Sequence, residues 1–568
     1  MDNKKIAEVF EEIANIFEIS DENFFKVNAY KKASLIVMNL AQDLRQMVEE
    51  TPQDIDKIPG IGKALKDKII ELVETGKCRE HERIKQGFPK GLLEMLKLRG
   101  LGPKKIKLFY LNLGIKTMPQ LKKAAEEHKL SELPGMGEKS EADILKSMKE
   151  FSMFSTDRHL VNEALQEAQR YIEYMNSCKE IQKIQYAGSL RRGKETIGDI
   201  DILVTAKDHS KVMEHFVKYE EVLNVIAEGD TKSSVILQSG IQVDLRVVAA
   251  ESFGAALHYF TGSREHNIKI RDLAKRKGMK ISEYGVFKGE KRIGGKTEEE
   301  IFKAVGLPYM PPEIRKNDGE FEYLLKHKKL PKLIELSDIK GDFHCHSNYS
   351  DGKNTIEEMA KTCIERGYEY FAMSDHSSVM GVTGGMGTSD IKKQWKEIDK
   401  LNKKFKGKIK ILKSCEVDIL KDGSLDFSDE VLKELDLCVI SAHMHQNLPA
   451  EDQTKRIIAA IENPYSKILG HPTGRLLNKR KEMEFDMKKV IAACVENDIY
   501  LEINSSPMRL DLTDKYVRIA KEKGAKFSIN TDSHSIDHLE FMKFGVAMAR
   551  RGWLEKKDVL NCKNLKGI

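Results

Sequence analysis

The spacing of hydrophobic residues changes along the chain and divides it into regions. Residues 1–150 show amphipathic helix patterns broken by short glycine turns, beginning with MDNKKIAEVFEEIANIF. Strand-like runs dominate from Ile181 to Val248. From Gly341 onward, apolar strand-like runs alternate with helical stretches, which is typical of a β/α architecture. We therefore expect a multidomain chain that combines α+β and α/β folds.

Length and composition narrow the class of protein. With 568 residues the chain is several times longer than one hydrophobic core usually organises, so we expect about three to five folded units. Hydrophobic residues make up 40% and charged residues 32%, a globular balance, and no apolar run approaches the roughly 18 residues of a membrane helix. Eight cysteines without a CxxC pair favour a reducing compartment, so we expect a cytoplasmic protein.

The net charge of +6 is too small to identify a partner, but its distribution is informative. Between Lys57 and Tyr110 there are 14 lysine and arginine residues and 6 acidic ones. Such an excess suits a surface that binds polyphosphate, because each cation near a phosphate releases a condensed counterion. A solvated helical face is the alternative reading if charge is the only signal.

One pattern occurs three times, as IPGIGKALKDKI at 58–69, LRGLGPKKIKLF at 98–109 and LPGMGEKSEADI at 133–144. The glycines permit a tight turn with outward N–H groups, and the N-terminus of the following helix favours an anion. The turn glycines are Gly60, Gly62, Gly100, Gly102, Gly135 and Gly137. A single copy would indicate a helix cap. Three copies resemble helix-hairpin-helix motifs, which predicts DNA binding through phosphates without reading of bases.

Two predicted strands direct three carboxylates to one surface. In GDIDILV the apolar residues alternate with Asp199 and Asp201, and in IQVDLRVV the apolar face lies opposite Asp244. Such a cluster costs stability unless cations neutralise it, and two magnesium ions would do so. Two metals on three carboxylates can activate a hydroxyl and stabilise a leaving pyrophosphate. The upstream Gly188, Ser189 and Arg192 can hold a triphosphate.

Gly-Ser followed about nine residues later by Asp-x-Asp resembles the nucleotidyltransferase signature, and YFTGSREHNIKIR at 259–271 narrows the resemblance to family X DNA polymerases such as polymerase beta. It implies that the three aspartates bind two Mg²⁺ or Mn²⁺ ions and that Asp244 also assists deprotonation of the primer 3′-hydroxyl. It also implies contacts to the nucleotide or template: Ser189 and Arg192 on the β- and γ-phosphates, Tyr259, Phe260 and Gly262 at the sugar, Asn267 at the minor-groove edge and Arg271 on the template strand. The chain departs from animal relatives at Gln242, where they carry arginine, and this puts the orientation of Asp201 and the turnover rate in question.

The first 90 residues resemble the lyase domain of polymerase beta, which removes deoxyribose phosphate through a Schiff base. Lys68 falls on the nucleophile, and Lys26 and Tyr30 match supporting residues. A Schiff-base lysine needs its pKa lowered by burial or neighbouring cations. Two further lysines of the family pocket fall on Ala64 and Glu80. Lys68 is therefore either a lyase nucleophile or only a ligand of a 5′-phosphate.

Ligand-type residues follow the apolar runs of the C-terminal region. They are His344, His346, Asp351, His376, Glu416, His443, His471, Asp532 and His534. Functional groups at the C-terminal ends of parallel strands are typical of catalytic β/α barrels. A single such histidine is usually a packed core residue, but nine ligands in register suffice for up to three Mn²⁺ or Zn²⁺ ions. The run YLEINSS predicts a seventh strand without an obvious ligand, and His445 and His538 are expected at the surface or behind the ligands.

The order His-x-His, Asp, His, Glu, His, His, Asp-x-His resembles the PHP (polymerase and histidinol phosphatase) domain and fills its nine positions. The expected domains are a lyase-like helical domain with a helix-hairpin-helix motif (1–90), a fingers-type domain with two such motifs (91–150), a nucleotidyltransferase palm (151–250), a thumb (251–315), a linker (316–338) and a PHP domain with a distorted β/α barrel (339–568).

These resemblances imply a bacterial or archaeal family X DNA polymerase that fills short gaps in DNA repair and carries a metal-dependent 3′→5′ exonuclease. AP endonuclease, 3′-phosphatase and deoxyribose-phosphate lyase activities would be additions. The expected partners are gapped or primer–template DNA and deoxynucleoside triphosphates, with no membrane, and the expected state is a monomer. One alternative is a polymerase whose PHP domain is only a scaffold, against which the nine ligands argue. Another is a phosphatase fused to a nucleotidyltransferase for tRNA or metabolites, against which the hairpins and YFTGS argue.

Overall fold

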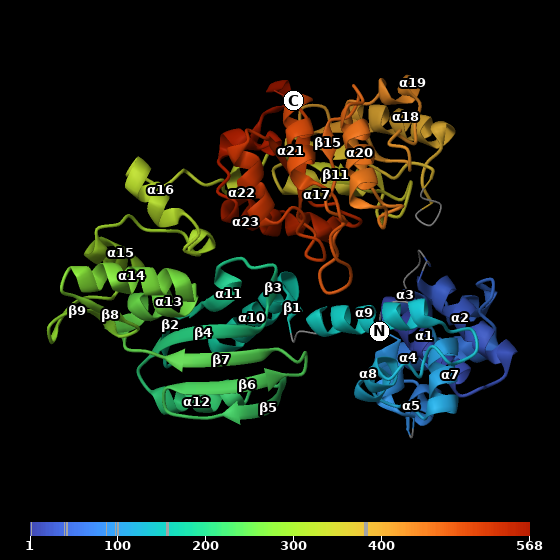
Figure 1. Ribbon diagram of the computed structural model, residues 1–568, viewed down its shortest axis with the longest axis horizontal. Helices are drawn as coiled ribbons and strands as arrows, with labels where there is room; N and C mark the ends of the chain where they lie inside the picture. Colours follow the sequence, from blue (N-terminus) through green and yellow to red (C-terminus); the bar gives the residue numbers. More distant parts are fainter. Residues whose placement is uncertain are drawn as a thin grey trace. The chain divides into compact units, whose positions relative to one another are not determined.

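The computed structural model describes residues 1, 3–38, 40, 44–86, 88–96, 98, 101–154, 158–379 and 384–567. They form two compact units, Met1–Thr156 and Asp157–Ile568 (Figure 1). Within the described ranges, no helix combines the length and the apolar composition that a membrane crossing requires.

The first unit is helical. In its first helix the residues Ile6, Phe10, Ile13 and Phe17 are spaced by three or four positions and are all buried, so an amphipathic pattern creates the core. One hydrophobic cluster joins residues between Ile6 and Cys78, and a second joins Ile19 with residues between Leu92 and Ile144. The helices are α1 (Asn3–Ile19), α2 (Phe24–Met38), α3 (Leu44–Glu50), α4 (Lys63–Thr75), α5 (Arg79–Lys85), α6 (Lys90–Met95), α7 (Pro103–Leu113), α8 (Met118–Glu126) and α9 (Glu138–Phe154).

The second unit begins with a five-stranded sheet in the order β2-β4-β7-β6-β5, whose strands lie side by side in Figure 1. Strands β4 and β7 are parallel, and the other neighbours are antiparallel. The apolar side chains of β4 and β7 share a buried cluster with helices α10 (Val161–Met175) and α12 (His209–Val217). The strands are β2 (Ile181–Tyr186), β4 (Asp199–Ala206), β5 (Val222–Ala227), β6 (Lys232–Leu237) and β7 (Gln242–Val247), and the short β1 (His159–Leu160) pairs with β3 (Thr196–Ile197).

A smaller group of elements follows the sheet. It contains α13 (Phe253–Thr261), α14 (Arg264–Arg276), the antiparallel strands β8 (Lys280–Ser282), β9 (Gly285–Lys288) and β10 (Lys291–Gly294), and α15 (Glu298–Val305). A fully buried Arg315 donates to Glu298 Oε1 at 2.5 Å. Arg191, in the segment between β2 and β4, donates to Glu298 Oε2 at 2.6 Å. These ion pairs tie this group to the sheet.

The segment 316–338, expected to be a linker, contains α16 (Glu320–His327) and is packed. Glu320 lies 2.9 Å from His266 Nδ1, and both side chains are buried. Phe321 and Leu324 share a hydrophobic cluster with Trp553 from the end of the chain. A helix of eight residues is too short for its apolar spacing to stand out against the surrounding prolines and lysines.

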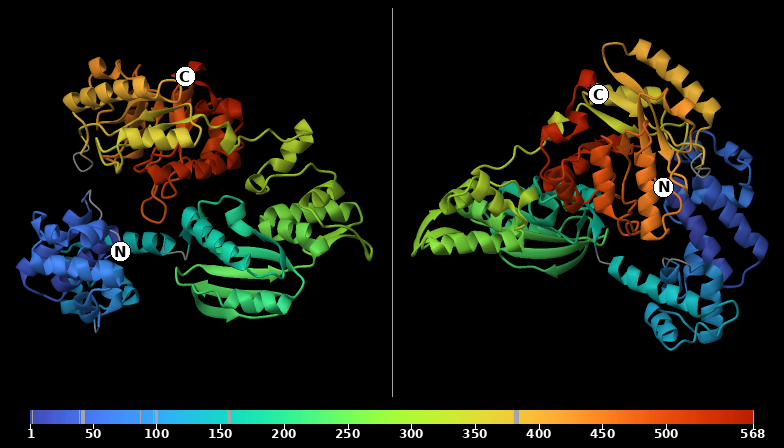
Figure 2. Two further views of the ribbon diagram at one scale, coloured as in Figure 1. Left: turned by 180° about the vertical axis from the view of Figure 1, so that it is seen from behind. Right: turned by 45° about the horizontal axis from the view of Figure 1, so that its top comes forward.

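The rest of the second unit is a nearly closed barrel of seven parallel strands surrounded by helices (Figure 2). Its strands are β11 (Gly341–Cys345), β12 (Tyr370–Met373), β13 (Lys410–Asp418), β14 (Leu437–Ser441), β15 (Ile468–Leu469), β16 (Tyr500–Asn504) and β17 (Phe527–Asn530). Its helices are α17 (Ile356–Glu365), α18 (Thr388–Lys404), α19 (Asp429–Leu432), α20 (Ala450–Ile461), α21 (Met487–Glu496), α22 (Asp514–Glu522) and α23 (Met542–Arg551).

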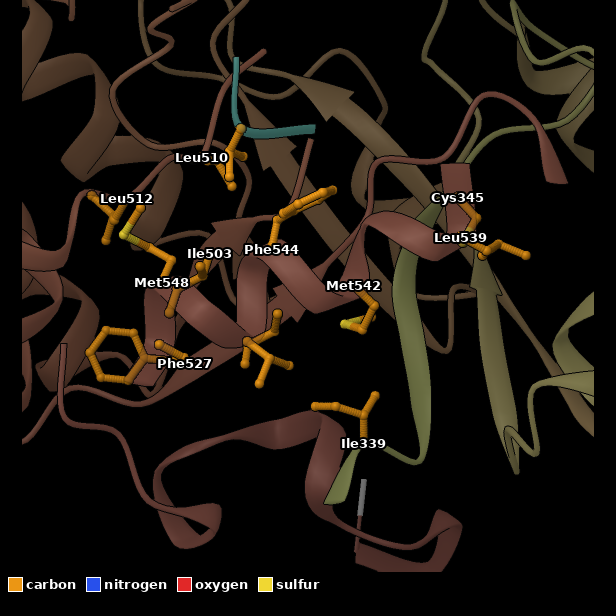
Figure 3. Close-up of a cluster of buried hydrophobic side chains, with 14 of the residues drawn as sticks. Ile339, Cys345, Ile503, Leu510, Leu512, Phe527, Leu539, Met542, Phe544 and Met548 are labelled. Carbon is orange, nitrogen blue, oxygen red and sulfur yellow. The ribbon is translucent and has the colours of Figure 1, made fainter. Parts of the chain in front are cut away.

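Packing outside the strands and hydrogen bonds at the seam hold the barrel together. In Figure 3 the α23 side chains Met542, Phe544 and Met548 lie beside the strand residues Ile503 and Phe527, and all five belong to one buried cluster. At the seam between β11 and β17, the buried Asn561 amide donates to Gly341 O at 2.9 Å and Ile529 O at 2.7 Å. The strand ends are thereby brought to one rim.

Candidate active sites

The three predicted carboxylates lie on one face of the sheet. Asp201 is paired directly with Asp244 across the parallel strands β4 and β7, and Asp199 is two residues earlier on β4. Their apolar neighbours Ile200, Ile202, Val243 and Leu245 are completely buried on the other face. The alternation in the sequence therefore creates the cluster.

The pKa values of Asp201 and Asp244 are shifted in opposite directions. Burial and the neighbouring Asp199 and Asp244 raise the pKa of Asp201 to about 7. Burial opposes ionisation of Asp244 as well, but hydrogen bonds from Gln242, Lys232 and Ser234 hold its pKa below the ordinary value. Three carboxylates with so little direct neutralisation form a site suited to divalent cations.

The loop before β4 lies against Asp201. Gly188 has a φ of +63°, and an added Cβ would lie 2.4 Å from Asp201 Oδ2, so the turn requires glycine. It opens the short helix α11 (Gly188–Arg191), which includes the half-buried Ser189. Arg192 donates to Thr261 O, and a Cβ added to Gly262 would lie 3.1 Å from its guanidinium. The structure thus brings Gly188, Arg192 and Gly262 to one place.

The remaining residues that were predicted to contact the nucleotide or the template lie on α13 and α14. The Asn267 amide donates to Tyr259 O at 2.7 Å, and its buried Oδ1 has no hydrogen-bond partner. The rings of Tyr259 and Phe260 pack edge to face, and the Arg246 guanidinium lies 4.3 Å from the Phe260 centroid. Arg271 is an exposed residue of α14.

In the first unit, Lys26, Tyr30 and Lys68 converge on Glu80. The Tyr30 hydroxyl donates to Glu80 at 2.6 Å, and the Lys68 and Lys26 amines lie 3.1 and 3.4 Å from its carboxylate. Burial opposes ionisation of Glu80, but these three partners lower its pKa. A carboxylate therefore lies at the centre of this cluster, at the position where the family carries a lysine and this sequence has Glu80.

The hairpin glycines open helices as their spacing predicts. Gly62 and Gly102 are the N-caps of α4 and α7, and Gly137 directly precedes α9. Gly60 and Gly135 adopt positive φ angles of 93° and 76°. Gly100 lies outside the described residues.

The nine predicted ligands of the barrel gather at one rim. All are on β11 and β13 or in the segments that follow β11, β12, β14, β15 and β17. Three sets have ligand atoms within 4.8 Å of one another: His346 with Asp351, His376 and His534; His344 with His346, Glu416 and Asp532; and His376 with Glu416 and His443. His471 Nε2 joins them at 2.9 Å from Glu416 Oε1.

Glu416 is the centre of this cluster. It is almost completely buried, and five imidazoles lie within 3.6 Å of its oxygens, those of His344, His346, His376, His443 and His471. Burial opposes its ionisation, but His344, His443 and His376 hold its pKa well below the ordinary value. Burial and the neighbouring His534 and His376 lower the pKa of His346 to about 3.

Several ligand atoms are buried and have no hydrogen-bond partner, which fits a site for metal ions. They are His344 Nε2, His346 Nδ1 and Nε2, His376 Nδ1 and Glu416 Oε2. Imidazole nitrogens and carboxylate oxygens in this arrangement are typical ligands of divalent transition metals.

Sequence reasoning missed the groups behind the ligands. Glu502 on β16 lies 2.8 Å from His344 Nδ1 and accepts from His471 N at 2.6 Å, and Asp418 lies 3.0 Å from His443 Nδ1. Such contacts fix the ring orientation and tautomer of a ligand. A charged residue between the apolar Leu501 and Ile503 of a predicted strand was the available signal for Glu502. His445 is exposed, and His538 Nδ1 lies 3.3 Å from His534 N.

Family models match most of the chain. In order, these are a helix-hairpin-helix domain (1–78), a SAM-like helix-hairpin-helix tandem (92–150), a DNA polymerase beta palm (158–254), a DNA polymerase beta thumb (256–316) and a PHP domain (342–506).

Known relatives resemble the whole chain or one part of it. The DNA polymerase/3′-5′ exonuclease PolX of Bacillus subtilis (strain 168) is 41% identical over 573 residues, covering 100% of this chain and 99% of that protein. DNA polymerase lambda of Rattus norvegicus is 26% identical over 347 residues, 55% of this chain and 56% of that protein. A probable phosphatase of Thermoanaerobacter sp. (strain X514) is 31% identical over 204 residues, 34% of this chain and 78% of that protein.

Proposed function

This chain belongs to the family X DNA polymerases that carry a PHP domain, and we propose that it fills short gaps in DNA during repair and removes nucleotides from 3′ ends. Full-length similarity to a polymerase/3′-5′ exonuclease supports both activities. Two separate clusters of ligand-type residues, one on the sheet and one at the barrel rim, support their assignment to different sites.

The polymerase reaction is assigned to Asp199, Asp201 and Asp244. They would hold two Mg²⁺ or Mn²⁺ ions, which supply Lewis acidity for the in-line displacement of pyrophosphate. Asp244 would also accept the proton of the primer 3′-hydroxyl. The Gly188 turn keeps space beside Asp201 open, and Ser189 and Arg192 would bind the β- and γ-phosphates. The unpartnered Asn267 Oδ1 and the Tyr259–Phe260 pair would contact the incoming nucleotide, and Arg271 the template strand.

The nuclease reaction is assigned to the rim of the barrel, with His344, His346, Asp351, His376, Glu416, His443, His471, Asp532 and His534 as ligands of up to three Mn²⁺ or Zn²⁺ ions. Such ions activate water at neutral pH when bound. Glu502 would hold the His344 ring in place, and Asp418 would do the same for His443. AP endonuclease and 3′-phosphatase activities would use the same site.

Binding to gapped DNA is assigned to the three hairpins, whose glycine turns and following helices suit phosphate oxygens. Lys26, Tyr30 and Lys68 would contact the 5′ side of a gap. We assign Lys68 to 5′-phosphate binding rather than to lyase chemistry, because Glu80 lies 3.1 Å from its amine.

The observation that carries the proposal is that one chain holds two clusters of ligand-type residues on two different sheets. The test uses wild type, Asp244→Ala and His344→Ala with a one-nucleotide gapped substrate, with and without deoxynucleotides. Asp244→Ala should lose primer extension and keep 3′→5′ degradation, and His344→Ala should show the reverse. Normal extension by Asp244→Ala would overturn the polymerase assignment. An exonuclease rate unchanged by both His344→Ala and Asp532→Ala would instead support a scaffold role for the barrel.

A further inference from the structure

A lysine from β6 makes direct contact with the three-carboxylate site. The Lys232 amine lies 3.1 Å from Asp244 Oδ2, and the Gln242 amide donates to Asp244 Oδ1 at 2.8 Å. Both oxygens of Asp244 are therefore engaged, one by a cation from the neighbouring strand and one by a neutral donor from its own strand.

The pairing of the strands explains these contacts. On β6 and β7, Ser234 lies opposite Asp244 and Lys232 lies opposite Arg246. Residues two apart on a strand share a face, so Lys232 is a diagonal neighbour of Asp244, within reach of a long side chain. Two further cations on this face are occupied elsewhere: the Arg246 guanidinium lies 4.3 Å from the Phe260 centroid, and the Lys183 amine, opposite Thr205 of β4, lies 5.6 Å from the Phe253 centroid.

Gln242 brings no charge to the site, and the charge beside Asp244 comes from Lys232 instead. An arginine at position 242 would carry its charge on β7 itself, whereas this chain supplies the charge from β6. We propose that Lys232, together with Gln242, is a positioning residue that fixes the Asp244 carboxylate for the polymerase reaction. The inference rests on the proposed polymerase function and goes beyond it by assigning a role to a residue outside the ligand set.

Two measurable consequences follow from this geometry. Without Lys232, the carboxylate keeps Gln242 and Ser234 but loses its only charged donor among these three. Misplacement of a reacting group lowers kcat by about 10- to 100-fold. The ammonium ion also competes with a metal ion for Oδ2. Its removal should therefore tighten metal binding at this site by roughly five- to tenfold, the size of a charge interaction at 3 to 4 Å in water.

The test compares Lys232→Ala, Lys232→Arg and the double variant Lys232→Ala/Gln242→Arg in the full chain. Single-turnover extension on gapped DNA gives kcat, a binding titration gives the DNA affinity, and Mn²⁺ binding is followed by EPR. The binding that Asp244→Ala removes identifies the sheet site. Lys218→Ala, which removes an exposed lysine paired with Glu214 on α12, is the charge-matched control.

We expect Lys232→Ala to lose kcat and to bind Mn²⁺ more tightly, with unchanged DNA affinity. The arginine at either position should restore both values toward wild type, since Gln242 is 2.8 Å from the carboxylate. A loss confined to DNA affinity, an unchanged Mn²⁺ affinity, or no rescue by Gln242→Arg would overturn the proposal. If wild type fails to extend a primer, the polymerase assignment is wrong, and the Mn²⁺ measurement still decides whether Lys232 holds Asp244.

Discussion

The sheet site and the barrel site both gather carboxylates, but they stabilise them in different ways. On the sheet, three aspartates come from two adjacent strands, and direct compensation comes from Lys232 and Gln242 beside Asp244. At the barrel rim, imidazoles alternate with carboxylates, and the central Glu416 is within 3.6 Å of five of them. The sheet site therefore has excess negative charge, whereas the rim is largely neutralised by its own residues.

Because of this difference, the loss of one ligand should change the stability of the fold differently at the two sites. On the sheet, Asp201 is ionised at a cost to the fold, so removing its charge should relieve repulsion. At the rim each carboxylate is the counterion of buried histidines, so removing one leaves them without a partner. Loss of a ligand should thus have opposite effects on stability at the two sites.

The largest contrast is expected for Glu416→Gln. It should reduce 3′→5′ degradation by at least about 100-fold and lower the free energy of unfolding of the metal-free chain by about 3 kcal/mol, because it breaks a buried ion-paired cluster. Exonuclease assays and denaturant unfolding measure the two effects. Glu462→Gln, at an exposed position of the same domain, should change neither. An unchanged unfolding midpoint for Glu416→Gln would remove the proposed difference between the sites.

The second contrast concerns metal ions. Mn²⁺ at about one hundred times its dissociation constant should stabilise the chain by roughly 2.7 kcal/mol, because the rim ligands come together only in the folded barrel. The melting temperature should rise, and His344→Ala should reduce the rise. Mg²⁺ should have a smaller effect at the rim, because Mg²⁺ prefers oxygen ligands and the rim offers mostly imidazole nitrogens. Equal stabilisation of wild type and His344→Ala by Mn²⁺ would contradict the assignment of the effect to the rim.

The two sites also differ in how far the sequence determines them. Strand alternation predicts that Asp199 and Asp201 share one face and that Asp244 lies opposite the apolar face of its strand. The pairing of β4 with β7, which brings the three together, is seen only in the structure, and the resemblance to family X polymerases was the reason to expect it. The ligands of the rim could be predicted because each follows an apolar run that ends at the same rim.

The sequence did not predict which side chains of different strands and helices contact one another. The proximity of Lys232 to Asp244 depends on the register of β6, and the contact of Glu502 with His344 depends on closure of the barrel. The packing of α16 against Trp553 joins segments more than 200 residues apart, and no local pattern encodes it. The predicted residues of one strand face or one rim therefore lie together in the structure, whereas their supporting partners were not predicted.

A smaller effect should follow from Asp201→Asn. Its pKa of about 7 lies above the ordinary value of 3.8, so folding favours the protonated form. Wild-type stability from this group is complete below about pH 4 and is lost as the pH rises through 7. In EDTA, Asp201→Asn should therefore match wild type at pH 4 and exceed it at pH 8. One pKa unit corresponds to about 1.4 kcal/mol, and after a discount for solvent screening we expect a difference of about 1 to 2 kcal/mol. Thermal unfolding across this range measures the difference, and a constant difference would exclude Asp201 as its origin.

The smallest effect is expected in the first unit, where a carboxylate is stabilised in a third way. Glu80 forms ion pairs with Lys26 and Lys68 and accepts a hydrogen bond from the Tyr30 hydroxyl. An anionic sugar phosphate entering this pocket meets that carboxylate. Glu80→Gln removes one charge, and an interaction of about 1 kcal/mol at this distance in water corresponds to roughly fivefold tighter binding of 5′-phosphorylated gapped DNA. Fluorescence anisotropy with 5′-phosphorylated and 5′-hydroxyl gaps measures this affinity, and Glu82→Gln, at an exposed position of the same helix, is the control.

Borohydride trapping of the same variants on abasic DNA tests whether Lys68 can form a Schiff base. A trapped complex that forms in Glu80→Gln and disappears in Glu80→Gln/Lys68→Ala would show that Glu80 suppresses lyase activity. Equal binding of both gaps by wild type and Glu80→Gln would mean that this pocket does not contact the 5′-phosphate.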